Sequence, residues 1–147
     1  MPLYLSAVDI APLLAWLTAL DLADWPLQTL ADGRVRPSFI TDLRWRRFGD
    51  ASDALAAACL QLCPGGTEQH RILALVLPGG VVDPHTDPWP CRVHVPLLTN
   101  PQAMLTVEGV DYHLEAGKAY LVDGRREHAV RNAGPTPRVH FVLDVVF

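Results

Sequence analysis

Two histidines and one aspartate have the side-chain types and the spacing needed to bind a metal ion. His85 and Asp87 lie two residues apart, and His128 follows much later in the chain. Side chains two apart in an extended strand point to the same side, so His85 and Asp87 can reach one ion. Two imidazoles and a carboxylate on one face of a metal form the facial arrangement that suits Fe(II). Such a site keeps positions open for a chelating co-substrate and for O2.

Other interpretations of these residue types are simpler. Asp87 precedes a proline, and as a turn residue its carboxylate would accept backbone hydrogen bonds instead of binding metal. His113 alternates with strand-like neighbours and is more typical of a half-exposed histidine than of a ligand. His70 has no partner at ligand spacing. The candidate metal site therefore consists of His85, Asp87 and His128.

Two arginines lie within segments that are otherwise rich in Val, Leu and Phe. Arg92 precedes His94 by two residues, and Arg138 lies near the C-terminal end of the chain. A buried arginine is costly unless an anion pairs with it, so each guanidinium requires a counter-ion. A dicarboxylate co-substrate would supply one with bidentate geometry. The alternative is that Arg92 or Arg138 pairs with Asp123 or Asp144 on a solvent-facing side of the sheet.

The elements that position these side chains are mainly strands. From Arg71 onward, short segments rich in Val, Ile, Leu and aromatic residues are separated by Gly, Pro, Asn and Asp. Many short strands with turn residues between them indicate a sandwich or barrel of the jelly-roll kind. Glu108 and Gly109 separate two strand-like runs, which predicts a hairpin over Met104–Glu115. The fold class predicted is therefore mainly β.

The N-terminal part of the chain has helical patterns instead. Asp9 and Pro12 predict a helix start, and the leucines within Leu13–Leu20 fall on one helical face. A second helix is predicted to start near Asp50, to run through an Ala- and Leu-rich segment, and to end at a Pro-Gly-Gly sequence. Between the two helices, Phe39–Arg47 is predicted to be a strand.

Length and composition favour one globular domain. The 147 residues can bury a sizeable core without disulfides. We predict a single domain over 1–147, in which 1–68 form a helix-rich N-terminal support and 69–147 form the core strands that carry the site. Half of the residues are apolar and the net charge is only −4, so a nucleic-acid partner is not expected. Nothing in the sequence specifies an oligomeric state.

The cellular setting follows from the cysteines and from the longest apolar stretch. The three cysteines are few and odd in number, as expected of reduced thiols rather than of a disulfide framework. The apolar stretch over 10–20 is about half of the ~20 residues needed to span a bilayer, and no secretory signal is expected. The sequence therefore predicts a cytoplasmic protein without a membrane partner.

The stretch Leu77–Phe147 resembles the aspartyl/asparaginyl β-hydroxylase family of 2-oxoglutarate dioxygenases. LPGGVVDPHTDP is similar to the first metal motif of that family, and RVHVPLLTNP is similar to its RxHxPL co-substrate strand. EHAVRNAGPTPRVHFVLDV is similar to its closing HxVxN…RxxxxxD segment. Three motifs in the family order cover about half of the chain.

The resemblance implies a double-stranded β-helix, a cupin-like jelly roll with two or so N-terminal helices packed on it. It implies that Fe(II) is bound by His85, Asp87 and His128. It also implies that Arg138 binds the distal carboxylate of 2-oxoglutarate and that Arg92 and His94 line the other end of the same pocket. The implied reaction uses O2 to hydroxylate an unactivated carbon, with succinate and CO2 as co-products.

Two departures from the family pattern concern the same site. Some family members have glycine where this chain has Asp87, so this chain has the fuller ligand set. The strand RILALVLPGG is apolar where a relative offers a serine to the co-substrate. This second departure affects how the carboxylates of 2-oxoglutarate would be bound.

The resemblance does not specify the substrate. Because the chain is short, we expect a small amino-acid-like molecule or an exposed peptide or protein side chain. Arg44, Arg46 and Arg47 form a basic cluster that is either a solvated face or a site for a substrate carboxylate. The competing prediction is a cupin-like protein that binds a small molecule or metal without oxygenase turnover, since His128 and Asn132 also fit a cupin half-motif.

Overall fold

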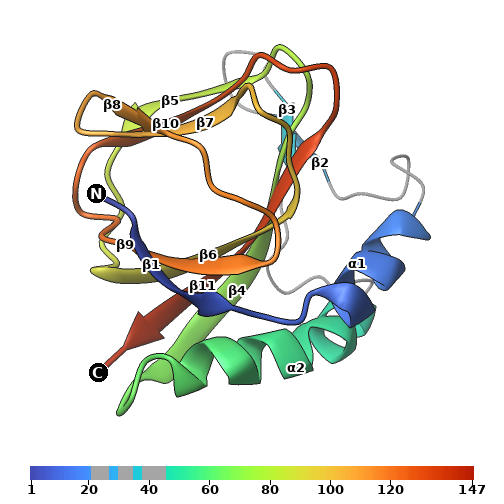
Figure 1. The fold of residues 1–147 in the computed structure, drawn as a ribbon, viewed down its shortest axis with the longest axis vertical. Helices are drawn as coiled ribbons and strands as arrows, with labels where there is room; N and C mark the ends of the chain where they lie inside the picture. The colour runs from blue at the N-terminus through green and yellow to red at the C-terminus, as the bar shows by residue number, and fades with distance from the viewer. Residues whose placement is uncertain (21–26, 30–34, 38–45) are drawn as a thin grey trace.

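The computed structural model describes residues 1–20, 27–29, 35–37 and 46–147. Within these ranges, two curved antiparallel sheets face each other, and two helices lie on the outer face of the larger sheet (Figure 1). This arrangement is a jelly roll, as in cupins, so the predicted fold class is confirmed.

Antiparallel pairing joins the neighbouring strands throughout both sheets. The five-stranded sheet has the order β1 (Leu3–Ala7), β9 (Lys118–Val122), β6 (Cys91–Leu98), β11 (Arg138–Val146) and β4 (Thr67–Val76). The four-stranded sheet has the order β5 (Val81–His85), β10 (His128–Asn132), β7 (Ala103–Val107) and β8 (Val110–Tyr112). A separate hairpin consists of β2 (Leu27–Thr29) and β3 (Val35–Pro37).

Strand β11, which lies between β6 and β4, is buried on both faces, and its two faces differ in chemistry. Val139, Phe141, Leu143 and Val145 belong to the apolar core shared with the helices. Because side chains alternate along a strand, the residues between them face the opposite sheet. These inward-facing residues are Arg138, His140, Val142 and Asp144. One face of the strand therefore builds the core and the other carries polar groups into the barrel.

Register confirms which side chains point inward. Arg138 pairs with Val76, and Arg92 pairs with Val122. Paired residues on neighbouring strands lie on the same face of the sheet. Val76 and Val122 belong to the interior apolar cluster with Leu105, Val107, Leu114 and Val130. Both arginines are thus on the inner face of the barrel.

The two helices are α1 (Ala11–Thr18) and α2 (Arg46–Gln61). Asp9 accepts a hydrogen bond from the backbone of Ala11 at the start of α1, and Leu13 and Leu17 of α1 are buried, as the leucine spacing predicts. Neither helix in the described part of the chain is long and apolar enough to cross a membrane.

Helix α2 begins earlier than the predicted start near Asp50. Phe48 is buried in the first turn and packs against Trp16 of α1, with ring centroids 6.0 Å apart. This tertiary contact supports helix before the capping residues. The strand predicted over Phe39–Arg47 is wrong for Arg46 and Arg47, which are helical, while 39–45 lie outside the described residues.

The hairpin predicted over Met104–Glu115 is confirmed as β7 and β8. Glu108 and Gly109 both have positive φ (48° and 81°), as in the type I′ turn that joins twisted strands. Strand β1 was not predicted. It adds an outer strand to the five-stranded sheet by pairing with β9, and Tyr4 contacts Tyr120 edge to face at 5.8 Å.

Candidate metal centre

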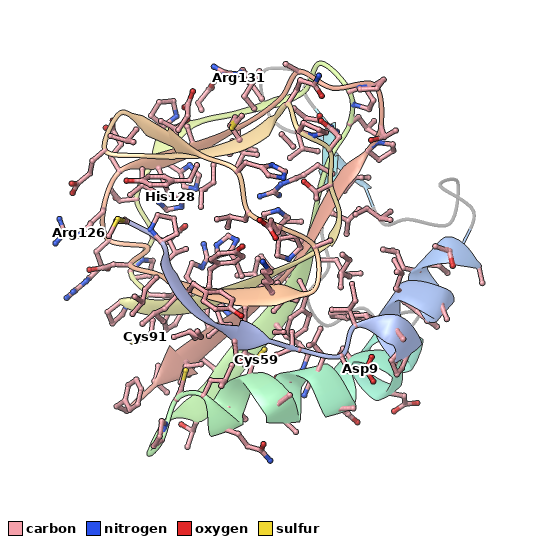
Figure 2. The ribbon with its side chains drawn as sticks, viewed as in Figure 1. Asp9, Cys59, Cys91, Arg126, His128 and Arg131 are labelled. Atoms are coloured by element: carbon pink, nitrogen blue, oxygen red, sulfur yellow. The ribbon has the colours of Figure 1, made fainter. Side chains whose placement is uncertain are left out.

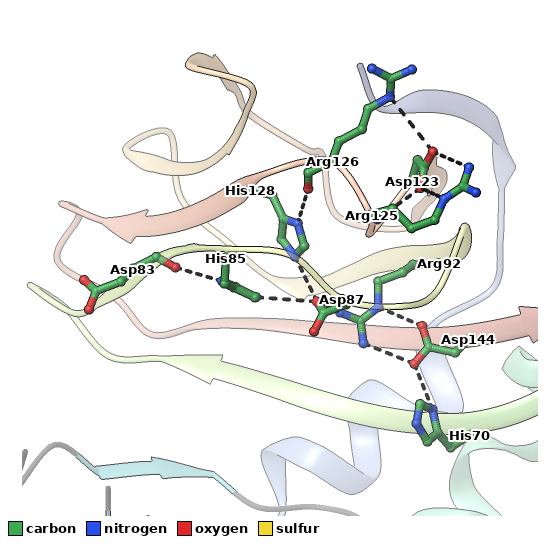
Figure 3. Close-up of polar contacts among 10 residues, drawn as sticks. All are labelled: His70, Asp83, His85, Asp87, Arg92, Asp123, Arg125, Arg126, His128 and Asp144. Atoms are coloured by element: carbon green, nitrogen blue, oxygen red, sulfur yellow. Dashed lines mark hydrogen bonds and ion pairs between the residues drawn. The ribbon is translucent and has the colours of Figure 1, made fainter. Parts of the chain in front are cut away.

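Strand pairing brings the three predicted metal ligands together. His85 ends β5 and His128 begins β10, and the two residues are register partners with ring centroids 4.3 Å apart. Asp87 follows β5 in a loop, and its Oδ2 lies 3.1 Å from His128 Nε2 and 3.5 Å from His85 Nε2. One ligand atom from each residue lies within 4.8 Å of the others (Figure 3).

The surroundings of both imidazoles determine which nitrogen faces Asp87. His85 Nδ1 lies 2.7 Å from the carbonyl oxygen of Asp83, and His128 Nδ1 lies 2.8 Å from that of Arg126. A carbonyl oxygen only accepts hydrogen bonds, so each Nδ1 carries the proton and donates it. In the neutral imidazoles, each Nε2 then has a free lone pair directed at the carboxylate. Backbone acceptors of this kind commonly orient histidine ligands of metals.

The side chain of His128 differs from its neighbours in exposure. Figure 2 shows His128 between the two sheets, whereas Arg126 and Arg131 project outward from the barrel. His128 is buried, while His85 and Asp87 are partly exposed. The three ligand atoms therefore lie at a boundary, with one side in the barrel and the other reachable from solvent.

Two backbone hydrogen bonds fix the loop that carries Asp87. The amide of Asp87 donates to the carbonyl of Gly124 (2.7 Å), and the amide of Gly124 donates to the carbonyl of Trp89 (2.9 Å). A Cβ at position 124 would lie 2.8 Å from the Trp89 oxygen, so only glycine permits this close approach. Sequence reasoning missed Gly124, because its role depends on a loop distant in the chain.

The donor set fits a divalent metal. Two imidazole lone pairs and one carboxylate oxygen face a common point. When both imidazoles are neutral, none of these three atoms carries a proton. A cation there would satisfy all three donors, and two nitrogens with one oxygen on one face match the ligand preference of non-haem Fe(II). The geometry can thus hold the ion that the sequence predicts.

Arg92 is already paired with carboxylates of the chain. Its Nε donates to Asp144 Oδ1 (2.7 Å), its Nη2 donates to Asp144 Oδ2 (3.1 Å), and its Nη1 donates to Asp87 Oδ2 (2.5 Å). The pairing with Asp144 that the sequence left open as an alternative is present, although inside the barrel rather than on a solvent-facing side. A role for Arg92 in binding 2-oxoglutarate stays a prediction.

Asp144, on strand β11 beside β6, anchors this arrangement. Asp144 is fully buried. Besides its contacts with Arg92, its Oδ2 lies 2.8 Å from His70 Nδ1. The ring of His70 packs edge to face on Trp89, with centroids 5.0 Å apart. His70, excluded as a ligand from the sequence, is thus no member of the metal group but does touch its supporting network.

Arg138 has a different environment from Arg92. It is 2% exposed, and its Nη2 donates to His140 Nδ1 (2.9 Å) while its Nη1 donates to the carbonyl of Ala74 (3.3 Å). No carboxylate in the described ranges forms an ion pair with it. Burial lowers the pKa of Arg138 to about 9, because the charged form is poorly solvated. An anionic ligand would relieve this cost.

Two histidines adjoin Arg138 on the inner face. His94 Nδ1 lies 3.3 Å from His140 Nδ1, and burial, reinforced by the positive charge of Arg138, holds the pKa of both histidines well below the ordinary value. His94 Nε2 is buried with no hydrogen-bond partner among the described residues. The neutral imidazoles of His94 and His140 therefore lie close to the guanidinium of Arg138 inside the barrel.

The remaining predicted residues lie elsewhere. His113 donates from Nδ1 to the carbonyl of Ala103 (3.1 Å) and is outside the metal group, as the sequence indicated. Of the basic cluster, Arg44 lies outside the described residues, and Arg46 and Arg47 open α2.

Three solved structures with the same fold illustrate what this chain resembles. AviO1 from Streptomyces viridochromogenes Tue57 aligns with a TM-score of 0.69 at 18% identity, over 98% of this chain and 88% of that chain. The non-heme alpha ketoglutarate dependent epimerase SnoN from nogalamycin biosynthesis aligns at 0.69 and 18% identity, over 97% and 77%. A 2OG-Fe(II) oxygenase family oxidoreductase from Burkholderia pseudomallei aligns at 0.58 and 13% identity, over 90% and 78%.

The low identities of these structures show a shared fold only. The sequence profile of the aspartyl/asparaginyl beta-hydroxylase family, however, matches residues 51–146, which is more than half of the chain and includes all three residues of the metal group. This match extends the resemblance seen in the three motifs over all strands from β4 to β11 and into α2. The chain belongs to the aspartyl/asparaginyl β-hydroxylase family.

Proposed function

We propose that this chain is an Fe(II)- and 2-oxoglutarate-dependent oxygenase. Its substrate would be an amino-acid-like molecule or a peptide or protein side chain, hydroxylated at an unactivated carbon with succinate and CO2 as co-products. The observation that carries the proposal is a pair of features inside one barrel. A His-Asp-His group and a buried guanidinium without a carboxylate partner among the described residues occur together.

The side chains of the metal group would each have a defined task. His85 and His128 present Nε2 because their Nδ1 protons are held by backbone carbonyls. Asp87 supplies an anionic oxygen that keeps the third protein position filled. Fe(II), with 2-oxoglutarate and O2, supplies the oxidising chemistry when bound at these three groups.

Arg138 would hold the far carboxylate of 2-oxoglutarate. Its Nη1 and Nη2 each donate one hydrogen bond within the chain, which leaves other N–H groups for a ligand. Binding a carboxylate would supply a counter-ion that the buried guanidinium does not find among the described residues. The apolar interior cluster, which includes Val76, Val122 and Val130, would exclude water from the reacting groups.

The test is a binding and turnover assay on the purified protein. Under anaerobic conditions, Fe(II) and 2-oxoglutarate together should raise the melting temperature, because both bind only the folded chain. With O2 and a panel of amino acids and peptides, free or blocked at the carboxyl group, succinate should form. His128→Ala should abolish succinate formation while the protein stays folded.

His113→Ala is the matched control, since it removes an imidazole outside the metal group. It should keep the turnover of the parent protein. An unchanged melting temperature with both ligands present would contradict the proposal. Ligand-induced stabilisation without succinate from any candidate would instead favour a cupin-like binding protein without turnover.

A further inference from the structure

Arg92, on β6, connects Asp87 of the metal group to Asp144 on the neighbouring strand β11. Three of its nitrogens donate to oxygens of Asp144 and Asp87, and its side chain is 12% exposed. Figure 3 shows these contacts as a continuous chain from His70 through Asp144 and Arg92 to Asp87. A guanidinium is planar and rigid, so fixing two of its nitrogens on Asp144 also fixes the direction of the third.

Asp144 is the fixed end of this chain. It lies on the most buried strand, where Phe141, Leu143 and Val145 pack into the core with the helices. Its register partners are Arg92 on β6 and His70 on β4, so both contacts arise from strand pairing rather than from a loop. The carboxylate of Asp144 therefore has little freedom to move.

Asp87 is the other end of this chain of contacts and lies in a loop beyond β5. Its side chain is 27% exposed, and the backbone bond to Gly124 fixes its main chain without fixing its carboxylate. Apart from the two imidazoles of the metal group, the side-chain contact recorded for Asp87 in the described ranges is with Arg92. The orientation of Oδ2 thus depends on this guanidinium.

We propose that Arg92 and Asp144 are positioning residues that aim Asp87 at the metal. This inference rests on the proposed Fe(II) site. The two arginines of the inner face then have separate tasks. Arg92, compensated by two carboxylates, supports the metal ligand, whereas Arg138, which lacks an acidic partner within the described residues, is available to an external anion.

The experiment measures metal and co-substrate affinity separately. Apoprotein is titrated with Mn(II) alone, followed by electron paramagnetic resonance and calorimetry, and 2-oxoglutarate is then titrated at saturating Mn(II). Arg92→Lys keeps the charge and one contact to Asp144 but cannot span both carboxylates. It should weaken Mn(II) binding about tenfold to a hundredfold, the usual cost of losing a group that supports a ligand.

Asp144→Asn provides an independent variant. It leaves the side-chain volume nearly unchanged but removes the charge that holds Arg92, and it should weaken Mn(II) binding in the same range. Asp111→Asn is the matched control, because Asp111 pairs with Arg131 away from the metal group and its supporting turn and should leave Mn(II) binding unchanged. Should Asp144→Asn fail to fold, Arg92→Lys decides the matter.

The outcomes separate this inference from the proposed function. Parent protein that does not bind Mn(II) would overturn both. If the parent protein binds Mn(II) and Arg92→Lys binds it equally tightly, only the positioning role is overturned. Unchanged Mn(II) affinity together with a tenfold weaker affinity for 2-oxoglutarate would place Arg92 in the co-substrate pocket instead.

Discussion

At the scale of single residues, the two inner-face arginines show that identical side chains on one sheet acquire different chemistry from their partners. Arg92 donates to Asp144 and Asp87, so its charge is balanced within the chain. Arg138 donates to neutral acceptors, and burial lowers its pKa to about 9. An unbalanced buried charge costs stability unless a ligand compensates it, which is typical of binding sites.

Arg138→Met tests this difference. The substitution should weaken 2-oxoglutarate binding by about 10- to 100-fold, because a charged hydrogen bond to a buried carboxylate contributes roughly 1.5–3 kcal/mol. It should not destabilise the apoprotein, since an apolar side chain of similar volume replaces an uncompensated charge. Calorimetry of the Mn(II)-loaded protein and urea unfolding of the apoprotein measure the two effects. If the parent protein and Arg138→Met bind 2-oxoglutarate equally tightly, Arg138 has a structural role and does not bind the co-substrate.

At the scale of elements, the metal group is assembled from two loops and two strand ends. Strands β5 and β10 bring His85 opposite His128, while the turn between β9 and β10 bonds to the loop of Asp87 through Gly124. The turn approaches this loop closely because position 124 has no Cβ. Metal affinity should therefore depend on Gly124, although glycine has no side chain that could bind a metal.

Gly124→Ala is predicted to weaken Mn(II) binding by at least about tenfold, since the added carbon would meet the Trp89 oxygen at 2.8 Å and Arg92 Cδ at 3.2 Å. The loop that carries Asp87 would have to shift. Titration of the apoprotein with Mn(II) measures the effect.

Gly49→Ala is the control with the same chemical change. An added Cβ at Gly49 in α2 has nothing within 4 Å, so alanine there should stabilise the helix by up to about 1 kcal/mol and leave metal binding unaltered. Similar losses of Mn(II) affinity in both variants would contradict the role assigned to Gly124.

At the scale of the whole molecule, the barrel separates an apolar outer layer from a polar interior. The larger sheet packs Val, Leu and Phe against α1 and α2 on one face and carries arginines and histidines on the other. His94 and His140 are buried there, and burial lowers the pKa of each below 6.5. As the pH falls, these two histidines therefore bind protons less readily in the folded apoprotein than in the unfolded chain.

The apoprotein should consequently lose stability as the pH falls below about 6.5. Above that pH both states hold these histidines neutral, and the histidines contribute no slope. Below it the unfolded chain binds the protons first, so each histidine lowers the free energy of unfolding by up to about 1.4 kcal/mol per pH unit. Urea unfolding between pH 7.5 and 5.5 measures the slope.

His140→Gln isolates one of these contributions, since glutamine keeps a hydrogen-bond acceptor available to Arg138. Its slope should be smaller than that of the parent protein. An identical slope in both proteins would show that the acid sensitivity arises from other groups.

The sequence by itself determined the local patterns and the residue types of the site. The hairpin at Glu108–Gly109, the leucine face of α1 and the strand alternation of β11 follow from interactions between near neighbours in the chain. The HxD spacing likewise indicated that His85 and Asp87 lie close enough to share one ion. These features need no knowledge of distant partners.

Only the tertiary structure decided which distant groups meet. The pairing of β1 with β9, the early start of α2 at Phe48, the approach of Gly124 to Trp89 and the contacts of Arg92 all join residues remote in sequence. Sequence showed that two buried arginines need counter-ions, but strand register assigned Asp144 to Arg92 and gave Arg138 no carboxylate partner among the described residues. The physical reason is that charge balance inside a barrel depends on which strands lie side by side.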